Sequence, residues 1–107
     1  MTAQNLNTNT YVIDVSATSQ YVTLSNTDKN TNSMIIYNGT TQDCFVVSGE
    51  TAPTVVFPTS SNDPLQGKVI GAGMMVTFTK LTNHGFIGAI QATAGTGSLY
   101  ISVGAGE

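Results

Sequence analysis

The chain has 107 residues, a formal net charge of −3 at pH 7, and a charged fraction of only 8%. This length fits a single domain, and the charged fraction lies far below the usual quarter or so of a soluble protein. The three positive side chains, Lys29, Lys68 and Lys80, are far apart in the sequence, and Arg is absent. Nucleic acids bind clustered cationic side chains, so the composition excludes direct nucleic-acid binding.

The first ten residues, MTAQNLNTNT, are polar and rich in Asn and Thr. We expect residues 1–10 to form a flexible arm and residues 11–107 to form the single domain. The N-terminus has neither the basic segment nor the apolar run of a signal peptide, and no stretch approaches the roughly 18 apolar residues of a membrane span. The lone Cys44 allows no intrachain disulfide and is interpreted as a small buried hydrophobe. We therefore expect folding in a cytoplasm and no membrane partner.

After the arm the chain is a series of short apolar runs separated by turn signals. Asn38-Gly39 predicts a hairpin, because both residues tolerate positive φ angles. The short run 54–57 lies between Pro53 and Pro58, which cannot donate to a β-ladder, so it is an edge strand or a connection. The longest loop spans residues 58–67. The predicted strands are 11–15, 21–24, 34–37, 43–48, 54–57, 68–70, 74–80, 85–93 and 98–103.

Apolar and polar residues alternate most clearly near the C-terminus, as expected for strands that bury one face. The alternation assigns Met74, Val76, Phe78, Leu99, Ile101 and Val103 to the core, and it places Phe86, Gly88, Ile90 and Ala92 on one shared face. The runs MIIY (34–37) and CFVV (44–47) are apolar on both faces, which is typical of strands covered twice or of an oligomer interface. The pattern predicts an all-β fold, an antiparallel β-sandwich or jelly-roll-like barrel of about eight short strands.

Residues equipped for catalysis are scarce. The only histidine, His84, lies in the turn 82–85 and is interpreted as a turn residue that tolerates unusual φ. No GxSxG motif and no Cys/His arrangement for nucleophilic catalysis is present. The carboxylates are scattered and form no recurring pair: Asp14, Asp28, Asp43, Glu50, Asp63 and Glu107. We predict that the protein is not an enzyme and has no catalytic, cofactor-binding or metal-binding residues.

Three partial motifs have simpler interpretations. Residues 28–32, DKNTN, open like an EF-hand calcium loop, but Ser33 and Gly39 stand where that loop needs Gly and Glu. Gly71-Ala72-Gly73 lacks the third Gly of a dinucleotide fingerprint, where Val76 stands, and is interpreted as a bend that enters a strand. Residues 38–40, NGT, form a glycosylation acceptor in the formal sense, and the turn interpretation suffices. None of them implies a cofactor.

The second half of the chain carries a longer pattern. VIGAGMMVTFTKL (69–81) places a Gly-containing bend before an alternating strand. IGAIQA (87–92) then leads into Gly95-Thr96-Gly97 and an ending with Leu99, Ile101, Gly104 and Gly106. This pattern resembles small tailed-bacteriophage virion proteins of the capsid decoration, or cement, type, and the stretch 34–47 fits the same style. The bend reads Gly-Ala-Gly where many such proteins have Pro-Gly.

The resemblance implies a non-enzymatic β-sandwich bound to the outer surface of a phage capsid, across junctions between major capsid proteins, which stabilises the head. The partner would be the major capsid protein, the location the capsid exterior, and the site of synthesis the host bacterial cytoplasm. We also expect a homo-oligomer, a dimer or trimer. Two alternatives stay open: another phage structural part, such as a head fibre base, tail or baseplate subunit, or a carbohydrate-binding or adhesin-like module.

Overall fold

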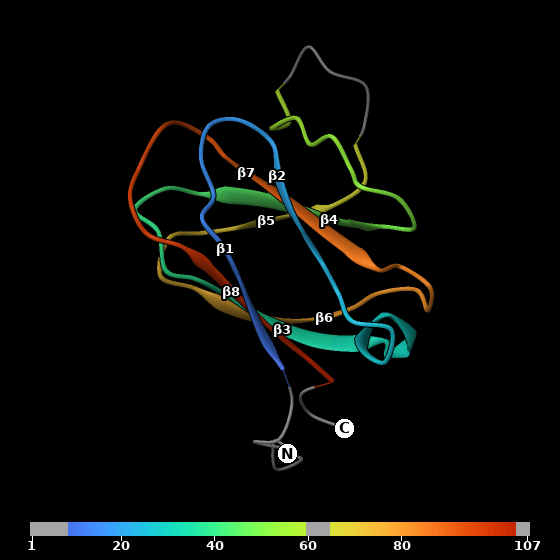
Figure 1. The fold of residues 1–107 in the computed structure, drawn as a ribbon. Coiled ribbons are helices and arrows are strands. Elements are labelled where there is room, and N and C mark those ends of the chain that lie inside the picture. The colour runs from blue at the N-terminus through green and yellow to red at the C-terminus, as the bar shows by residue number, and fades with distance from the viewer. Residues whose placement is uncertain (1–8, 60–64, 105–107) are drawn as a thin grey trace.

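The computed structural model describes residues 9–59 and 65–104, which fold into two antiparallel four-stranded sheets packed face to face (Figure 1). The strands are β1 (Thr10–Ile13), β2 (Gln20–Thr23), β3 (Ser33–Asn38), β4 (Cys44–Gly49), β5 (Lys68–Ile70), β6 (Met75–Thr79), β7 (Phe86–Gln91) and β8 (Leu99–Val103), with one 3₁₀ turn, η1 (Asp28–Asn30). The all-β prediction is confirmed. No helix in the described ranges has the length and apolar character needed to cross a membrane.

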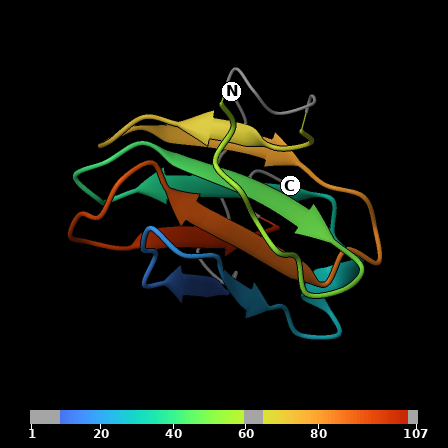
Figure 2. The same ribbon diagram turned by 90° about the horizontal axis from the view of Figure 1, so that it is seen from above.

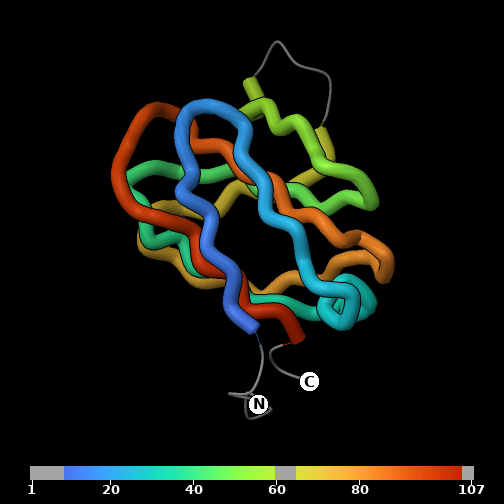
Figure 3. The backbone as a smooth tube through the Cα atoms, in the orientation of Figure 1, coloured from blue at the N-terminus to red at the C-terminus, as the bar shows by residue number. Residues whose placement is uncertain are grey.

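The strand order is β1-β8-β3-β6 in one sheet and β2-β7-β4-β5 in the other. The pairs β1–β8, β2–β7, β3–β6 and β4–β5 are nested within one another along the chain, as in a jelly roll. The first and last described strands therefore lie side by side (Figure 3). Of the predicted arm, the structure describes Asn9 and Thr10, and Thr10 begins β1.

Alternating side chains of both sheets form the core. On β8, Leu99, Ile101 and Val103 are buried as predicted. On β6, Val76 and Phe78 pack against the core, but Met74 is 55% exposed, so its assignment to the core is wrong. Met74 lies in the bend before β6, where its backbone N–H donates to the carbonyl of Gly71 over 3.0 Å, and strand alternation has not yet begun.

The predicted Asn38-Gly39 hairpin is wrong, because β3 and β4 belong to different sheets. Neither residue has a positive φ. Asn38 is instead fully buried, and its side-chain amide donates to the backbone carbonyls of Gln42, over 2.9 Å, and Ile70, over 2.8 Å. The Asn side chain thus satisfies backbone acceptors where the chain crosses from one sheet to the other.

The segment 50–59 covers the outer face of the sheet β2-β7-β4-β5. It contains no strand, so the run 54–57 is a connection. Val55 is 4% exposed and lies over Gly88 of β7, and Phe57 meets Phe45 of β4 edge to face, with ring centroids 6.3 Å apart. Figure 2 shows this yellow-green segment crossing in front of β4 and β7. The strand CFVV is therefore covered twice, once by the core and once by its own chain.

The two sides of the sandwich differ. On one side the edge strands β1 and β2 lie against each other. On the opposite side β5 and β6 are the edges of their sheets, and each is hydrogen-bonded to one neighbour only (Figure 2). The side between β5 and β6 is where the interior opens to solvent.

Candidate functional site

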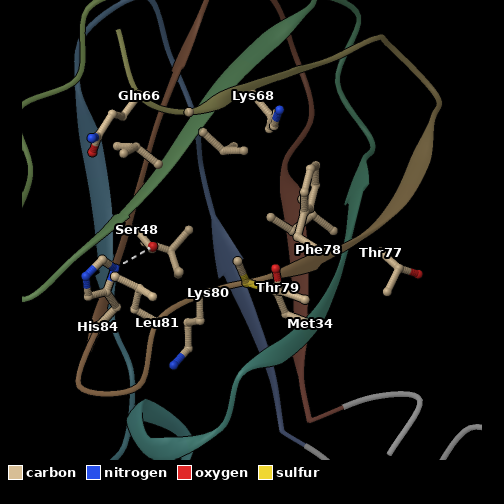
Figure 4. A pocket seen from close by; sticks show the side chains of 15 residues that line it. Met34, Ser48, Gln66, Lys68, Thr77, Phe78, Thr79, Lys80, Leu81 and His84 are labelled. Atoms are coloured by element: carbon tan, nitrogen blue, oxygen red, sulfur yellow. Dashed lines mark hydrogen bonds between the residues drawn. The ribbon is translucent and has the colours of Figure 1, made fainter.

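The interior opens into a cavity of about 570 Å³ between the β5 and β6 edges (Figure 4). Its walls combine polar residues with five side chains of the core, Met34, Ile36, Val46, Phe78 and Ile87. The polar groups stand at its margin, where Ser48, Gln66, Lys68 and His84 contribute side chains. A space of this size, with apolar side chains on its inner walls and polar groups beside them, has the dimensions of a small-molecule pocket.

His84 lies at this margin and contacts a serine from another strand. The hydroxyl of Ser48 on β4 and Nδ1 of His84 are 2.8 Å apart, within hydrogen-bonding distance. The positive φ of the turn, 70°, belongs to Asn83, so His84 is not the residue with the unusual backbone. A serine and a histidine in contact are two parts of a nucleophilic site, which also needs a group that orients the imidazole. No carboxylate is among the residues that line the cavity.

Cys44 is the one cysteine of the sequence, and it lies in the core. Cys44 is fully buried, as predicted, and burial raises the pKa of its thiol. Among the described residues no three His, Cys, Asp or Glu side chains lie together in a way that would hold a metal ion. Two of the six carboxylates, Asp63 and Glu107, lie outside the described residues.

Asp28 and Lys80 form a buried polar cluster at the end of the sandwich near η1. Tyr11 and Asn9 donate hydrogen bonds to the Asp28 carboxylate. Burial alone would raise the pKa of Asp28, but hydrogen bonds from Tyr11, Asn9 and Ser25, together with the charge of Lys80, hold it below its ordinary value of 3.8.

Lys80 follows β6 directly and turns its ammonium group inward. Its Nζ donates to the backbone carbonyls of Lys29 and Thr31. Burial lowers the pKa of Lys80, and the nearby Asp28 partly offsets this effect. Lys29 and Thr31 belong to the loop 28–32, which opens like an EF-hand calcium loop. Two backbone carbonyls of this loop therefore accept hydrogen bonds from the ammonium group of Lys80.

The second candidate surface is the outer side of the sheet β1-β8-β3-β6, which we call the bare face. None of its four strands contains a Lys, Asp or Glu. Its core-facing side chains alternate with outward ones, as the period of a strand requires. The outward side chains of the bare face are Thr10, Val12, Ser33, Ile35, Tyr37, Met75, Thr77, Thr79, Tyr100 and Ser102.

A row of large apolar side chains crosses the bare face through all four strands. The strand register aligns Val12 with Tyr100, Tyr100 with Tyr37, and Tyr37 with Met75. These four side chains are 51%, 42%, 37% and 64% exposed, in that order. The two tyrosine rings stack, with centroids 6.1 Å apart and planes inclined by 22°. The row joins strands from both ends of the chain.

The sequence contained only part of the signal for these sites. The run MIIY was apolar on both faces, and its outward members Ile35 and Tyr37 lie on the bare face. The contact between Ser48 and His84 joins residues 36 positions apart, so no motif marks it. The alignment of Val12 with Tyr100 likewise depends on pairing of the first strand with the last.

Comparison with protein-family models, with curated proteins and with solved structures finds no match to this chain. Function is therefore inferred from the surfaces described above and from the pattern in the sequence.

Proposed function

We propose that this protein is a non-enzymatic structural protein of a tailed-phage virion, which binds the outer surface of the capsid across junctions between major capsid proteins and stabilises the head. The observation that carries the proposal is the bare face, whose strands have no Lys, Asp or Glu, over which no described segment lies, and which carries a row of exposed Val, Tyr and Met side chains. Tyr and Met are enriched where proteins bury surface against one another, and charged residues are depleted there.

Three further points support it. A surface without charged groups loses little hydration when another protein covers it. The second half of the sequence resembles capsid decoration proteins, and jelly rolls are frequent in capsid proteins, although a fold by itself does not define a function. One domain repeated over a symmetric shell also gains avidity from many weak contacts.

The test uses phage particles made with and without the protein. Particles that lack it should assemble but release DNA at a lower temperature or after milder osmotic shock. Purified wild-type protein added back should restore the release temperature, and should bind bare particles nearly as well at 500 mM as at 50 mM salt, because no ion pairs carry the contact.

A matched pair of variants locates the contact. Tyr100→Asp places a charge in the centre of the row and should abolish binding, whereas Tyr21→Asp, at a tyrosine of β2 that is 54% exposed on the other sheet, should bind like wild type. Unchanged binding of Tyr100→Asp would contradict the role of the bare face. Equal release temperatures with and without the protein, or its location only in the tail, would contradict the capsid proposal.

A further inference from the structure

The free edges of the two sheets differ in how they are protected. Natural proteins protect exposed strand edges by keeping them short, by adding charges or proline, or by covering them, because an open edge pairs with other chains. The edges β1 and β2 lie against each other. The edge β5 has only three residues and carries Lys68. The edge β6, MVTFT, has five residues with no charge and no proline.

The backbone of β6 presents hydrogen-bonding groups to solvent at alternate residues. The N–H of Lys80 donates to Asn32, and the N–H of Asn38 donates to the carbonyl of Met74. These contacts fix the phase of the antiparallel ladder between β3 and β6, in which hydrogen-bonded pairs alternate with unbonded ones. Val76 and Phe78 therefore bond to β3, whereas the N–H and C=O groups of Met75, Thr77 and Thr79 point away from the sheet.

The most exposed large hydrophobic side chains of the described residues gather at this strand. Leu81 is 68% exposed, Met75 is 64% exposed and Met74 is 55% exposed. Met74 and Met75 stand at the start of β6, and Leu81 stands just beyond its end. An open hydrogen-bonding edge flanked at both ends by exposed apolar side chains has the composition of an interface rather than of a solvated surface.

We propose that β6 is a homodimer interface, in which β6 of a second copy pairs antiparallel with it about a two-fold axis at Thr77. This proposal does not depend on the proposed function. Because Met75, Thr77 and Thr79 all present backbone groups outward, a register centred on Thr77 pairs each of them. Thr77 exchanges hydrogen bonds with the second copy's Thr77, and Met75 does so with the second copy's Thr79.

The same register also determines what the exposed side chains beside β6 would contact in the dimer. Leu81 stands two residues beyond Thr79, so the register brings it toward the bend that precedes the second copy's Met75. Gly73 in that bend has open space beside it, with nothing within 4 Å of the position that a Cβ would take. The chain carries a net charge of −3, which opposes association of two copies over most surfaces. At β6 no charged side chain faces outward, because Lys80 is 6% exposed and donates to carbonyls of its own chain. A two-fold contact of this kind closes on itself and stops at two copies.

Sedimentation of the full chain over a range from about 1 to 200 μM tests the pairing. The wild type should shift from monomer to dimer within this range, as expected for a small interface. Thr77→Lys places two ammonium groups at the two-fold axis and should weaken the dimer at least about tenfold, since like charges directly opposite on paired strands repel. The control is Thr23→Lys, the same change at an exposed threonine of the edge strand β2, which should leave dimerisation unchanged.

Thr77→Cys keeps the test decisive if the lysine variant folds poorly. Residues in a hydrogen-bonded antiparallel pair have Cα atoms about 5.5 Å apart, within the range that a disulfide spans. Mild oxidation should cross-link this variant to a covalent dimer, whereas Thr23→Cys should remain monomeric on a non-reducing gel. The native Cys44 is fully buried and should not contribute. A wild type that stays monomeric at 200 μM, or a dimer unaffected by Thr77→Lys with no cross-link through position 77, would overturn the proposal.

Discussion

The two outer faces of the sandwich are treated differently by the same chain. The segment 50–59 packs over the outer face of the sheet β2-β7-β4-β5. Pro53 and Val55 contact Gly88 of β7, and Phe57 contacts Phe45 of β4. No described segment packs over the outer face of the sheet β1-β8-β3-β6, and Tyr37, Tyr100 and Met75 remain exposed there. Both faces carry apolar residues, so hydrophobic patterning alone does not distinguish a face covered by its own chain from one open to a partner.

We call the segment 50–59 over the sheet β2-β7-β4-β5 the cover. A larger side chain beneath the cover should give the largest loss of stability. A Cβ at Gly88 would lie 2.5 Å from Cγ of Pro53 and 2.7 Å from Cγ2 of Val55, so Gly88→Leu must displace the segment. We expect the free energy of unfolding to fall by about 3 kcal/mol. Urea denaturation measures it, with Val12→Leu on the bare face as the control, expected to change stability by less than about 0.5 kcal/mol. A Gly88→Leu variant as stable as wild type would show that the cover is not packed as described.

A matched pair of valine truncations compares the two faces directly. Val55 is 4% exposed within the cover, and Val12 is 51% exposed on the bare face. Val55→Ala should lower the free energy of unfolding by about 2 kcal/mol, because it leaves a cavity, whereas Val12→Ala should cost less than about 0.5 kcal/mol. Equal losses in urea denaturation would contradict the contrast between the faces.

At the η1 end of the sandwich the charged groups of Asp28 and Lys80 are both buried rather than placed on the bare face. The pH dependence of stability measures what the buried carboxylate of Asp28 contributes. The pKa of Asp28 is lowered in the folded protein, so its contribution to stability is present above the ordinary value of 3.8 and disappears as the pH falls through the folded value. Asp28→Asn should cost about 1 kcal/mol at pH 7, from weakened hydrogen bonds to a charged acceptor.

The difference in stability between wild type and Asp28→Asn should shrink as the pH is lowered from 6 to 2, measured by urea denaturation at each pH. Asp14→Asn is the control, since Asp14 is exposed and, among the described residues, accepts one side-chain hydrogen bond, from Ser98 over 2.8 Å. Its difference from wild type should be small at every pH. A gap for Asp28→Asn that stays constant or widens in acid would contradict the lowered pKa.

The sequence predicted the strands well because their signal is local. Period-two alternation placed Leu99, Ile101 and Val103 in the core, and the short strand at 68–70 has the predicted bounds. The failed hairpin has a non-local cause, which is that a jelly roll pairs residues far apart in the chain. Asn38-Gly39 looked like a hairpin because the dipeptide is a local signal, whereas the crossing between sheets is decided by the distant pairings β3–β8 and β4–β7.

The candidate surfaces were less predictable for the same reason. The alternation correctly placed Phe86, Gly88 and Ile90 on one face of β7, but the core lies on the other, with Ile87 and Ala89. Both faces of β7 are covered, one by the core and one by the segment 50–59, which passes over Gly88, so the alternation within β7 does not show which face is inward.

The smallest predicted effect concerns the stacked tyrosines at the centre of the row. The register pairs Tyr37 with Tyr100 on neighbouring strands, and stacked aromatic pairs contribute beyond the area that they bury. A double-mutant cycle with Tyr37→Ala, Tyr100→Ala and the combined variant should give a coupling energy of about 0.5–1 kcal/mol in urea denaturation.

The cycle also sharpens the comparison of the faces, because a row that serves a partner needs its rings held in place before the partner arrives. The control cycle combines Val12→Ala with Met75→Ala at the two ends of the row, two positions separated by both tyrosines. These changes should be additive within about 0.3–0.5 kcal/mol, since the side chains share no direct contact. If the tyrosine cycle is also additive, the rings are not ordered as a pair in the free protein, and the bare face gains its shape only when a partner covers it.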